Sequence, residues 1–291
     1  MKPPTRRSVA GAREFAFSER DFERIRALIH ARAGIALGAG KQEMVYSRLA
    51  RRLRSQGIAS FDEYLKQLEA GQREGEWEEF TNALTTNLTS FFRESHHFPI
   101  LAAHARAAAQ PLKIWCAGAS SGEEAYSVAM TLCEVFNTLT PPVRILATDI
   151  DTKVLSIAAE GIYPLEKVSQ IGAERMRRFF LRGTGPNDGQ ARIRPELRRL
   201  VTFGRSNLLA PHWPVKSKLD ALFCRNVMIY FDKPTQARTI GRFAALLKPD
   251  GLLFAGHSEN FLHAGEALTL RGKTVYQLRA AGADNAPRRT A

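Results

Sequence analysis

The stretch Leu112-Lys-Ile-Trp-Cys-Ala-Gly-Ala-Ser-Ser-Gly-Glu-Glu124 decides the fold class of this chain. Its first six residues form a short, nearly continuous apolar run, which is typical of a strand buried on both faces of a parallel sheet. Gly118 and Gly122 allow the backbone to turn sharply and to approach a ligand closely, and helical sequence follows to about residue 137. A strand, a glycine turn and a helix in this order predict the first unit of a doubly wound α/β sheet.

Strand-like and helical segments alternate over the rest of residues 111–280. We expect further strands at residues 143–148, 219–224, 252–256 and 273–278, and helices at residues 151–159 and 234–247. Residues 162–205 interrupt this alternation, because they are basic, rich in glycine, and contain short β-like pieces near 191–194 and 200–203. The sequence therefore predicts a Rossmann-like doubly wound domain over 111–280 that carries a small β-rich insertion at 162–205.

The residues before this domain have helical patterns. We expect an all-helical N-terminal domain at residues 15–90 and a linker helix at 91–110. Ser18 and Asp21 have the spacing of a capping box at a helix start, and Gly34 is placed to end that helix. Further helices are expected at residues 41–56, 61–70, 74–85 and 94–109.

The helix expected at residues 41–56 carries a basic face. Four cations project into one sector roughly 100° wide beside its apolar stripe, namely Lys41, Arg48, Arg51 and Arg52. Such a face is suited to dock an acidic partner and to raise the rate of association. The alternative is an ordinary solvated helix face.

The composition limits the class of protein and its partners. The formal charge of +13 attracts polyanions, which include nucleic acid, anionic membrane and acidic proteins. No apolar run is long enough to span a bilayer, and the N-terminus lacks the apolar core of a signal peptide, so we expect a cytoplasmic protein without membrane insertion. Three cysteines without close pairing argue against a disulfide framework and a zinc site, and we expect no metal.

The glycine turn points to a particular cofactor. The turn does not read GxGxxG and ends in Glu123, whose carboxylate would repel a pyrophosphate at the helix start. S-adenosylmethionine has no phosphate and carries an amino group and a sulfonium. Asp149 ends the next strand, where a carboxylate can accept both ribose hydroxyls. The alternative is a structural turn, with Glu123 as a first-turn helix charge and Asp149 as a helix cap.

Five longer motifs resemble those of the chemotaxis receptor glutamate methyltransferases, the CheR family. They occur in order as Asn87-Leu-Thr-Ser-Phe-Phe-Arg-Glu94, Ser120-Ser-Gly-Glu-Glu124, Ala147-Thr-Asp-Ile-Asp151, Cys224-Arg-Asn-Val-Met-Ile-Tyr-Phe231 and Leu247-Lys-Pro-Asp-Gly251. The resemblance implies that the residues binding S-adenosylmethionine are Asn87, Thr89, Arg93, Glu123, Asp149, Asn207, Leu208, Arg225 and Asn226. It implies that Arg93 and Tyr230 flank the reacting methyl group.

The resemblance also implies a reaction and its partners. The methyl group would pass to glutamate side chains on the helical bundles of chemoreceptors, which forms methyl esters and leaves S-adenosylhomocysteine. Residues 182–189 resemble a loop of those members that bind a receptor C-terminal peptide. Two other readings stay open: a nucleic-acid methyltransferase, supported by the charge but lacking the Pro-Pro motif of amino-methylating enzymes, and a non-catalytic module that binds cofactor or receptor.

Overall fold

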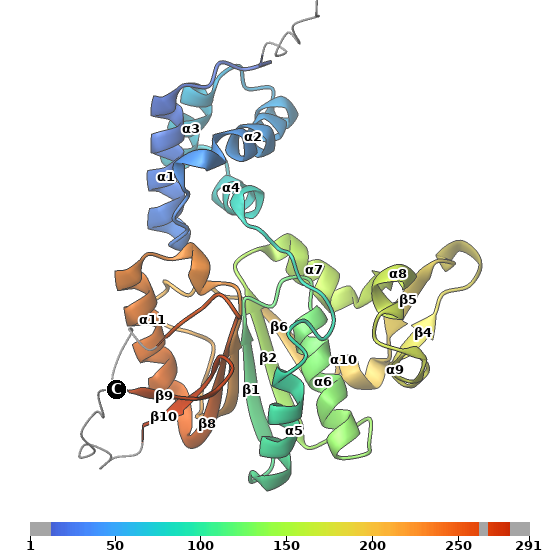
Figure 1. Ribbon diagram of the computed structural model, residues 1–291. Coiled ribbons are helices and arrows are strands. Elements are labelled where there is room, and N and C mark those ends of the chain that lie inside the picture. The colour runs from blue at the N-terminus through green and yellow to red at the C-terminus, as the bar shows by residue number, and fades with distance from the viewer. Residues whose placement is uncertain (1–12, 262–266, 280–291) are drawn as a thin grey trace, which may run out of the picture.

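The computed structural model describes residues 13–261 and 267–279, which form a helical domain above an α/β domain (Figure 1). The helical domain contains α1 (Glu19–Ala33), η1 (Ala39–Lys41), α2 (Gln42–Gln56), α3 (Phe61–Glu69) and α4 (Glu76–Leu84). The expected capping box is present, since the Ser18 hydroxyl accepts the Asp21 N–H and the Asp21 carboxylate accepts the Ser18 N–H. Gly34 ends α1 in the left-handed conformation, as predicted. These four helices pack around a hydrophobic core of their own.

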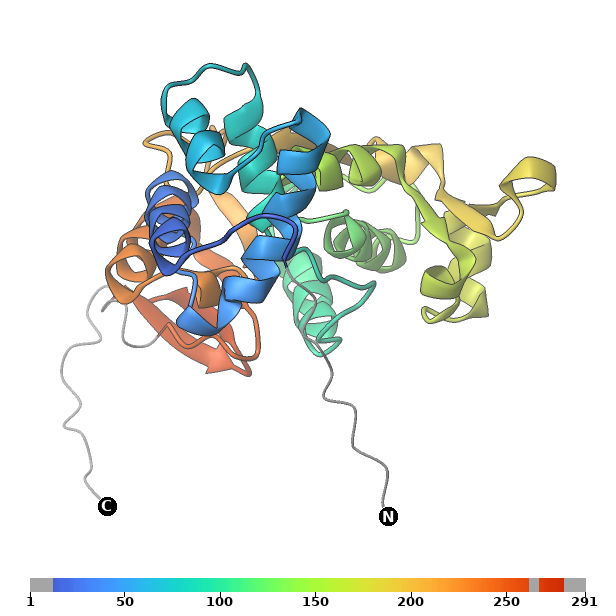
Figure 2. The ribbon, with the colours of Figure 1, turned by 90° about the horizontal axis from the view of Figure 1, so that it is seen from above.

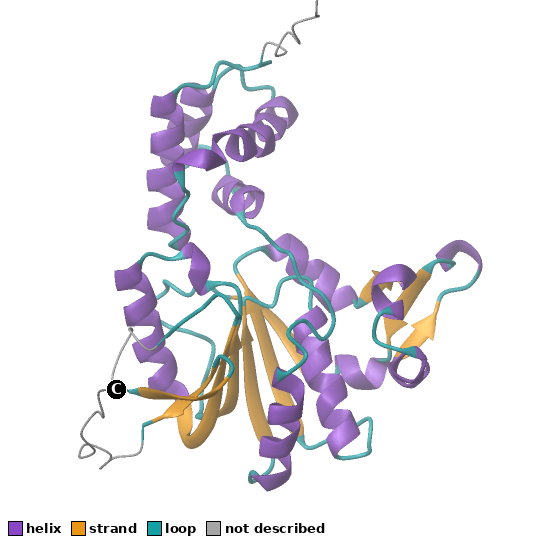
Figure 3. Ribbon diagram, in the orientation of Figure 1, coloured by secondary structure: helices purple, strands orange, loops and turns teal. Residues whose placement is uncertain are grey.

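A seven-stranded sheet forms the centre of the α/β domain (Figure 3). Its order is β6-β2-β1-β7-β8-β10-β9, and only β10 and β9 run antiparallel to their neighbours. Its strands are β1 (Leu112–Ala117), β2 (Val143–Asp149), β6 (Val201–Arg205), β7 (Leu219–Cys224), β8 (Leu247–Ala255), β9 (Leu268–Gly272) and β10 (Val275–Leu278). The predicted doubly wound fold is therefore confirmed, although the sequence did not indicate β9.

Helices cover both faces of the sheet, which explains the continuous apolar run of β1. Ile114 belongs to the core under α5 (His97–Ala107) and α6 (Glu123–Val135). Trp115 points to the opposite face and packs on Phe243 of α11 (Lys233–Leu246). Because both faces are buried, the four consecutive residues Ile114–Ala117 of this strand are all apolar rather than alternating.

The insertion is a small antiparallel sheet of order β3-β5-β4, which lies to one side of the central sheet (Figure 2). It comprises β3 (Ile162–Pro164), α8 (Leu165–Ser169), α9 (Ala173–Phe179), β4 (Phe180–Arg182), η2 (Gly185–Asn187), β5 (Gln190–Ile193) and α10 (Pro195–Arg198). The expected insertion reached residue 205, and this boundary was wrong. β6 instead pairs with β2 in the central sheet. The prediction failed here because the sequence of a short strand does not show which strand it pairs with.

The connection between the domains is mostly not helical. The helix expected to begin at Glu94 is α5, which begins at His97 instead. In the α/β domain, α7 (Thr152–Glu160) follows β2. Phe92 and Glu94 have φ values of +53° and +54°, which end any helix through this segment. Residues 85–96 therefore form a linker that crosses the carboxyl ends of the strands. Within the ranges 13–261 and 267–279, no helix is long and apolar enough to cross a membrane.

Candidate active site

A cavity lies between the two domains, at the carboxyl ends of β1, β2 and β7, where ligands bind in doubly wound sheets. The helical domain contributes residues around the end of α1 and η1, among them Ala36 and Lys41. Eight of the nine predicted cofactor residues line it, together with Tyr230: Asn87, Thr89, Arg93, Asp149, Asn207, Leu208, Arg225 and Asn226. The fold thus brings together residues that are up to 143 positions apart in the chain.

The glycine turn after β1 is shaped by close contacts. Gly118 has a φ of +83°, and a Cβ at this position would lie 2.3 Å from Cγ2 of Val227. Gly122 has a φ of +95°, and a Cβ there would lie 2.8 Å from Cβ of Ala158. A side chain at Gly118 would push the turn away from the loop after β7, and one at Gly122 would push it away from α7. The two glycines therefore allow the turn to pack closely against both elements.

Asp149 is the buried carboxylate of the cavity wall. Its Oδ2 accepts the Ser120 N–H at 2.8 Å, and its Oδ1 accepts the Asp151 N–H at 3.0 Å. Burial raises the pKa of this carboxyl group, while these N–H groups oppose the shift. A carboxylate has about four lone-pair sites, so each oxygen keeps an acceptor site for a hydroxyl group. This donor-acceptor pattern fits a ribose diol.

Contrary to the prediction, Glu123 does not line the cavity, and the neighbouring Glu124 does. Glu123 is fully buried, where its carboxylate accepts the Ser121 hydroxyl at 2.7 Å and lies 3.5 Å from the Lys167 amine of the insertion. Neighbouring residues of a helix point about 100° apart, so the next glutamate faces the cavity instead. The motif contains both acids, and only the rotation of α6 distinguishes them.

Arg225 organises the charges beside Glu124. Its guanidinium lies 3.2 Å from the Glu124 carboxylate and 3.4 Å from that of Glu94, and it donates to the Arg93 carbonyl. Burial raises the pKa of Glu124 to about 7, and Arg225 opposes this rise. Arg225 therefore forms buried ion pairs, and the same side chain also lines the cavity.

Glu259 fixes the loop that follows β7. Its buried carboxylate accepts backbone N–H groups of Asn226, Val227, Met228 and Gly256. This loop holds Asn226 at a φ of +60°, which few residues other than glycine and asparagine adopt readily. The sequence analysis did not single out Glu259, because its role depends on contacts with a loop more than 25 residues earlier in the chain.

The two residues expected to flank the methyl group lie on opposite segments of the cavity. Arg93 comes from the linker, and its Nη1 donates to the Leu88 carbonyl at 2.9 Å. Tyr230 comes from η3 (Met228–Tyr230), and its carbonyl accepts the Ala36 N–H from the helical domain at 2.7 Å. Leu88 also lines the cavity while 81% exposed, so it forms an apolar lip that sequence reasoning missed.

Asn207 and Leu208, two of the predicted cofactor residues, follow β6. The Asn207 amide donates to the Arg32 carbonyl at 2.7 Å, and its oxygen accepts the Leu209 N–H. Both polar atoms of this side chain are therefore engaged in holding the loop against the helical domain. Leu208 is buried and presents an apolar surface suited to a flat ring.

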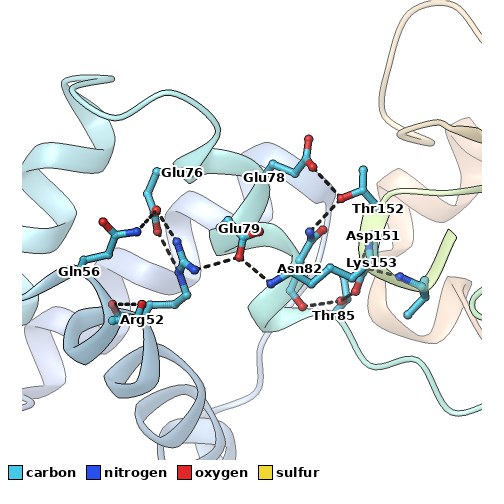
Figure 4. Close-up of polar contacts among 12 residues, drawn as sticks. Arg52, Gln56, Glu76, Glu78, Glu79, Asn82, Thr85, Asp151, Thr152 and Lys153 are labelled. Atoms are coloured by element: carbon cyan, nitrogen blue, oxygen red, sulfur yellow. Dashed lines mark hydrogen bonds and ion pairs between the residues drawn. The ribbon is translucent and has the colours of Figure 1, made fainter. Parts of the chain in front are cut away.

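The predicted docking face is only partly available, and this expectation is corrected. Arg52 lies 2.6 Å from Glu76 and 3.0 Å from Glu79 of α4 (Figure 4). Arg48 donates to backbone carbonyls at the end of α4. Lys41 and Arg51 are exposed, and their side chains have no hydrogen-bond or ion-pair partner within the described part of the chain. Helix periodicity placed all four cations together but could not show that Arg52 pairs with acids of α4 or that Arg48 bonds to backbone carbonyls at its end.

Comparison with known proteins decides the family. The family profile "CheR methyltransferase, SAM binding domain" matches residues 87–277, and "CheR methyltransferase, all-alpha domain" matches residues 20–85. The chain belongs to the CheR methyltransferase family. This CheR-family chain is 53% identical to the chemotaxis protein methyltransferase 2 of Pseudomonas aeruginosa over 95% of its own length and 99% of that protein. It is 53% identical to the chemotaxis protein methyltransferase of Escherichia coli strain K12 over 90% and 92% of the two chains.

The cavity of this CheR-family methyltransferase suits S-adenosylmethionine, its cofactor. Asp149 keeps acceptor sites for two hydroxyls, and Glu124 with Arg225 offers one charge of each sign. Gly118 lines the cavity and has no side chain, so the backbone of the turn can approach a bound ligand closely. Among the residues that the structure describes, no cluster of histidine, cysteine and acids could hold a metal ion.

Proposed function

We propose that this CheR-family methyltransferase methylates glutamate side chains of bacterial chemoreceptors and forms glutamyl methyl esters. The observation that carries the proposal is the cavity wall, where Arg93 and Tyr230 accompany the cofactor residues and no described lining residue is a histidine. A glutamate carboxylate has a reference pKa near 4.3 and is already a nucleophilic anion at pH 7. An acceptor of this kind requires no general base. The names of the chemotaxis relatives support the same choice.

The cofactor residues divide by their chemistry. S-adenosylmethionine supplies, when bound, a methyl group made electrophilic by the sulfonium charge. Asp149 would hold the ribose hydroxyls through its remaining acceptor sites, and Leu208 would pack on adenine. Glu124 would accept from the amino group, and Arg225 would pair with the carboxylate of the methionine part, since charges of opposite sign match.

Arg93 and Tyr230 would orient the acceptor. The Tyr230 hydroxyl and the Arg93 guanidinium can donate to one carboxylate oxygen while the other oxygen forms the bond to the methyl carbon. Arg93 already donates to the Leu88 carbonyl, which limits how many donors it can turn toward the acceptor. The helical domain forms one wall of the cavity and limits access of water. Catalysis would then come mainly from positioning.

Lys41 and Arg51 are the cations we propose for docking a receptor helix. Lys41 lies on the cavity wall, and both side chains are exposed. Receptor modification sites are rich in glutamate, so these cations would attract them electrostatically and in a salt-dependent way. This two-residue surface replaces the four-residue face expected from periodicity.

We further propose that a receptor C-terminal peptide pairs with the insertion. β4 is an edge strand bonded only to β5, and the loop 183–189 follows it. An edge strand offers unpaired backbone groups to an extended peptide. Tethering by such a peptide would raise the local concentration of acceptor glutamates. Receptors with and without their last residues should then differ in KM, and equal values would exclude the tether.

The chemistry is tested with radiolabelled cofactor and receptor-containing membranes. We expect label on receptor protein that mild alkali releases as methanol, because esters hydrolyse under conditions that leave methylated amines intact. Parallel incubations with DNA and RNA test the nucleic-acid alternative. Alkali-stable label on protein, or label on nucleic acid alone, would contradict the proposal. A variant Arg93→Ala that transfers methyl at the normal rate would contradict the assigned role of Arg93.

A further inference from the structure

Asp151 links the start of α7 to the segment that connects the two domains. Its side chain is 2% exposed. Oδ1 accepts the N–H groups of Lys153 at 2.9 Å and of Val154 at 3.4 Å, which makes Asp151 the N-cap of α7. Oδ2 accepts the Thr85 hydroxyl at 2.7 Å (Figure 4). The same oxygen accepts the Asn87 side-chain amide, also at 2.7 Å. One buried carboxylate therefore serves both a helix end and the linker.

The contact with Asp151 fixes which way the Asn87 amide faces. An ionised carboxylate can only accept, so Asn87 must direct its NH2 group to Asp151. The side-chain carbonyl oxygen of Asn87 then remains as the hydrogen-bond acceptor of this amide, and Asn87 lines the cavity. An amide turned the other way would place two acceptors against each other and present a donor to the cofactor instead.

Asp151 also contacts the opposite side of the cofactor site. Its backbone N–H donates to Oδ1 of Asp149 at 3.0 Å. The backbone carbonyl of Asn87 accepts the Ser120 hydroxyl at 3.0 Å, and the Ser120 N–H donates to the Asp149 carboxylate. The linker, the glycine turn and the end of β2 thus form one closed ring of hydrogen bonds. Asn87 and Asp149, which are both expected to hold the cofactor, are members of this ring.

The surrounding ion pairs hold α7 against the helical domain. Glu79 of α4 accepts from Lys153 at 2.6 Å and from Arg52 of α2 at 3.0 Å (Figure 4). The Thr152 hydroxyl donates to Glu78 at 2.6 Å. Because α4 and α7 are joined in this way, the linker that follows α4 cannot move far from Asp151.

We propose that Asp151 is a positioning residue for S-adenosylmethionine, which acts by orienting Asn87 and by holding the linker over the cavity. Asp151 does not line the cavity and is assigned no contact with the cofactor. Its effect on cofactor affinity should therefore depend on the presence of the Asn87 amide.

The test is a double-mutant cycle of Asp151→Asn and Asn87→Ala, measured by calorimetry of cofactor binding. Asparagine caps helices about as well as aspartate, so the fold should survive Asp151→Asn. The introduced amide can, however, present NH2 to Asn87 and allow that amide to turn over. We expect each single variant to weaken binding about tenfold, the scale of a lost hydrogen bond to a polar ligand, and the double variant to be no weaker than Asn87→Ala alone.

Kinetics and a matched variant separate positioning from general stability. Asp151→Asn should raise KM for the cofactor and leave kcat at saturating cofactor within about twofold. Asp232→Asn alters another N-cap near the domain boundary, where Asp232 accepts the Thr235 N–H at 2.8 Å, and should leave cofactor affinity unchanged. Additive losses in the cycle, an unchanged affinity of Asp151→Asn, or equal weakening by Asp232→Asn would overturn the proposal. Unfolding of Asp151→Asn would also overturn it, since Asp151 would then serve the fold rather than the cofactor.

Discussion

Replacement of Glu124 should change how cofactor binding depends on pH. Burial raises the pKa of Glu124 to about 7, with Glu94 and Glu259 adding to the rise and Arg225 and Arg93 opposing it. If the cofactor amino group requires the ionised form, binding must remove a proton from Glu124 below pH 7. Affinity should then be about tenfold lower at pH 6 than at pH 8, because about nine tenths of the carboxyl groups are protonated at pH 6.

The assay is isothermal calorimetry of S-adenosylhomocysteine or S-adenosylmethionine in two buffers with different ionisation enthalpies. The wild-type protein should release about half a proton per bound cofactor at pH 7. Glu124→Gln should bind more weakly at pH 8 and lose the proton release. Glu123→Gln is the matched control, since the neighbouring acid faces Ser121 and Lys167 and should keep both the pH dependence and the proton release.

The same pKa predicts the stability of the cofactor-free protein. A carboxyl group whose pKa is raised by folding stabilises the folded state fully below its unfolded value of about 4.5, and that contribution is lost as the pH rises through 7. The difference amounts to about 3 kcal/mol. Glu124→Gln should therefore gain stability relative to the wild type between pH 5 and pH 8, measured by urea unfolding.

Equal cofactor affinities of the wild-type protein at pH 6 and pH 8, without proton release, would refute the assignment of Glu124.

Three further outcomes follow from the site. Asp149→Ala should weaken cofactor binding by about 1.5–3 kcal/mol in calorimetry, the size of a lost charge-assisted hydrogen bond, and unchanged affinity would exclude the ribose role. Arg51→Glu should raise the receptor KM at low salt without lowering the melting temperature, whereas Arg52→Glu should lower the melting temperature because it breaks two ion pairs with α4. Leu88→Ala should raise the receptor KM and leave cofactor affinity unchanged, while Leu270→Ala, which removes another exposed leucine side chain away from the cavity, should change neither.

The sequence predicted the fold class because its signals are local. The apolar run of β1 and the glycines at 118 and 122 each require a particular backbone within a few residues. The capping box at Ser18 likewise forms between residues three positions apart. β6 pairs with β2, which lies more than 50 residues earlier, so the sequence misplaced it. β9 pairs with its sequence neighbour β10, and the sequence analysis missed it.

Most of the cofactor residues that the motifs predicted line the cavity, but the motifs did not show which charged side chains pair with one another. Asp149 and Asn226 lie at strand ends, where parallel topology alone brings them to one edge. Arg52 differs from Arg51 only through α4, whose acids approach one of the two neighbouring cations.

The glycine turn shows the division between sequence and tertiary structure most clearly. The letters at 118–124 determined a sharp strand-to-helix turn with acids at the helix start, because glycine content and helix periodicity are properties of the chain itself. Only the packed structure decided that Glu124 lines the cavity while Glu123 is buried against Lys167. The rotation of α6 about its axis is set by what it packs against, and a rotation of about 100° exchanges one glutamate for the other.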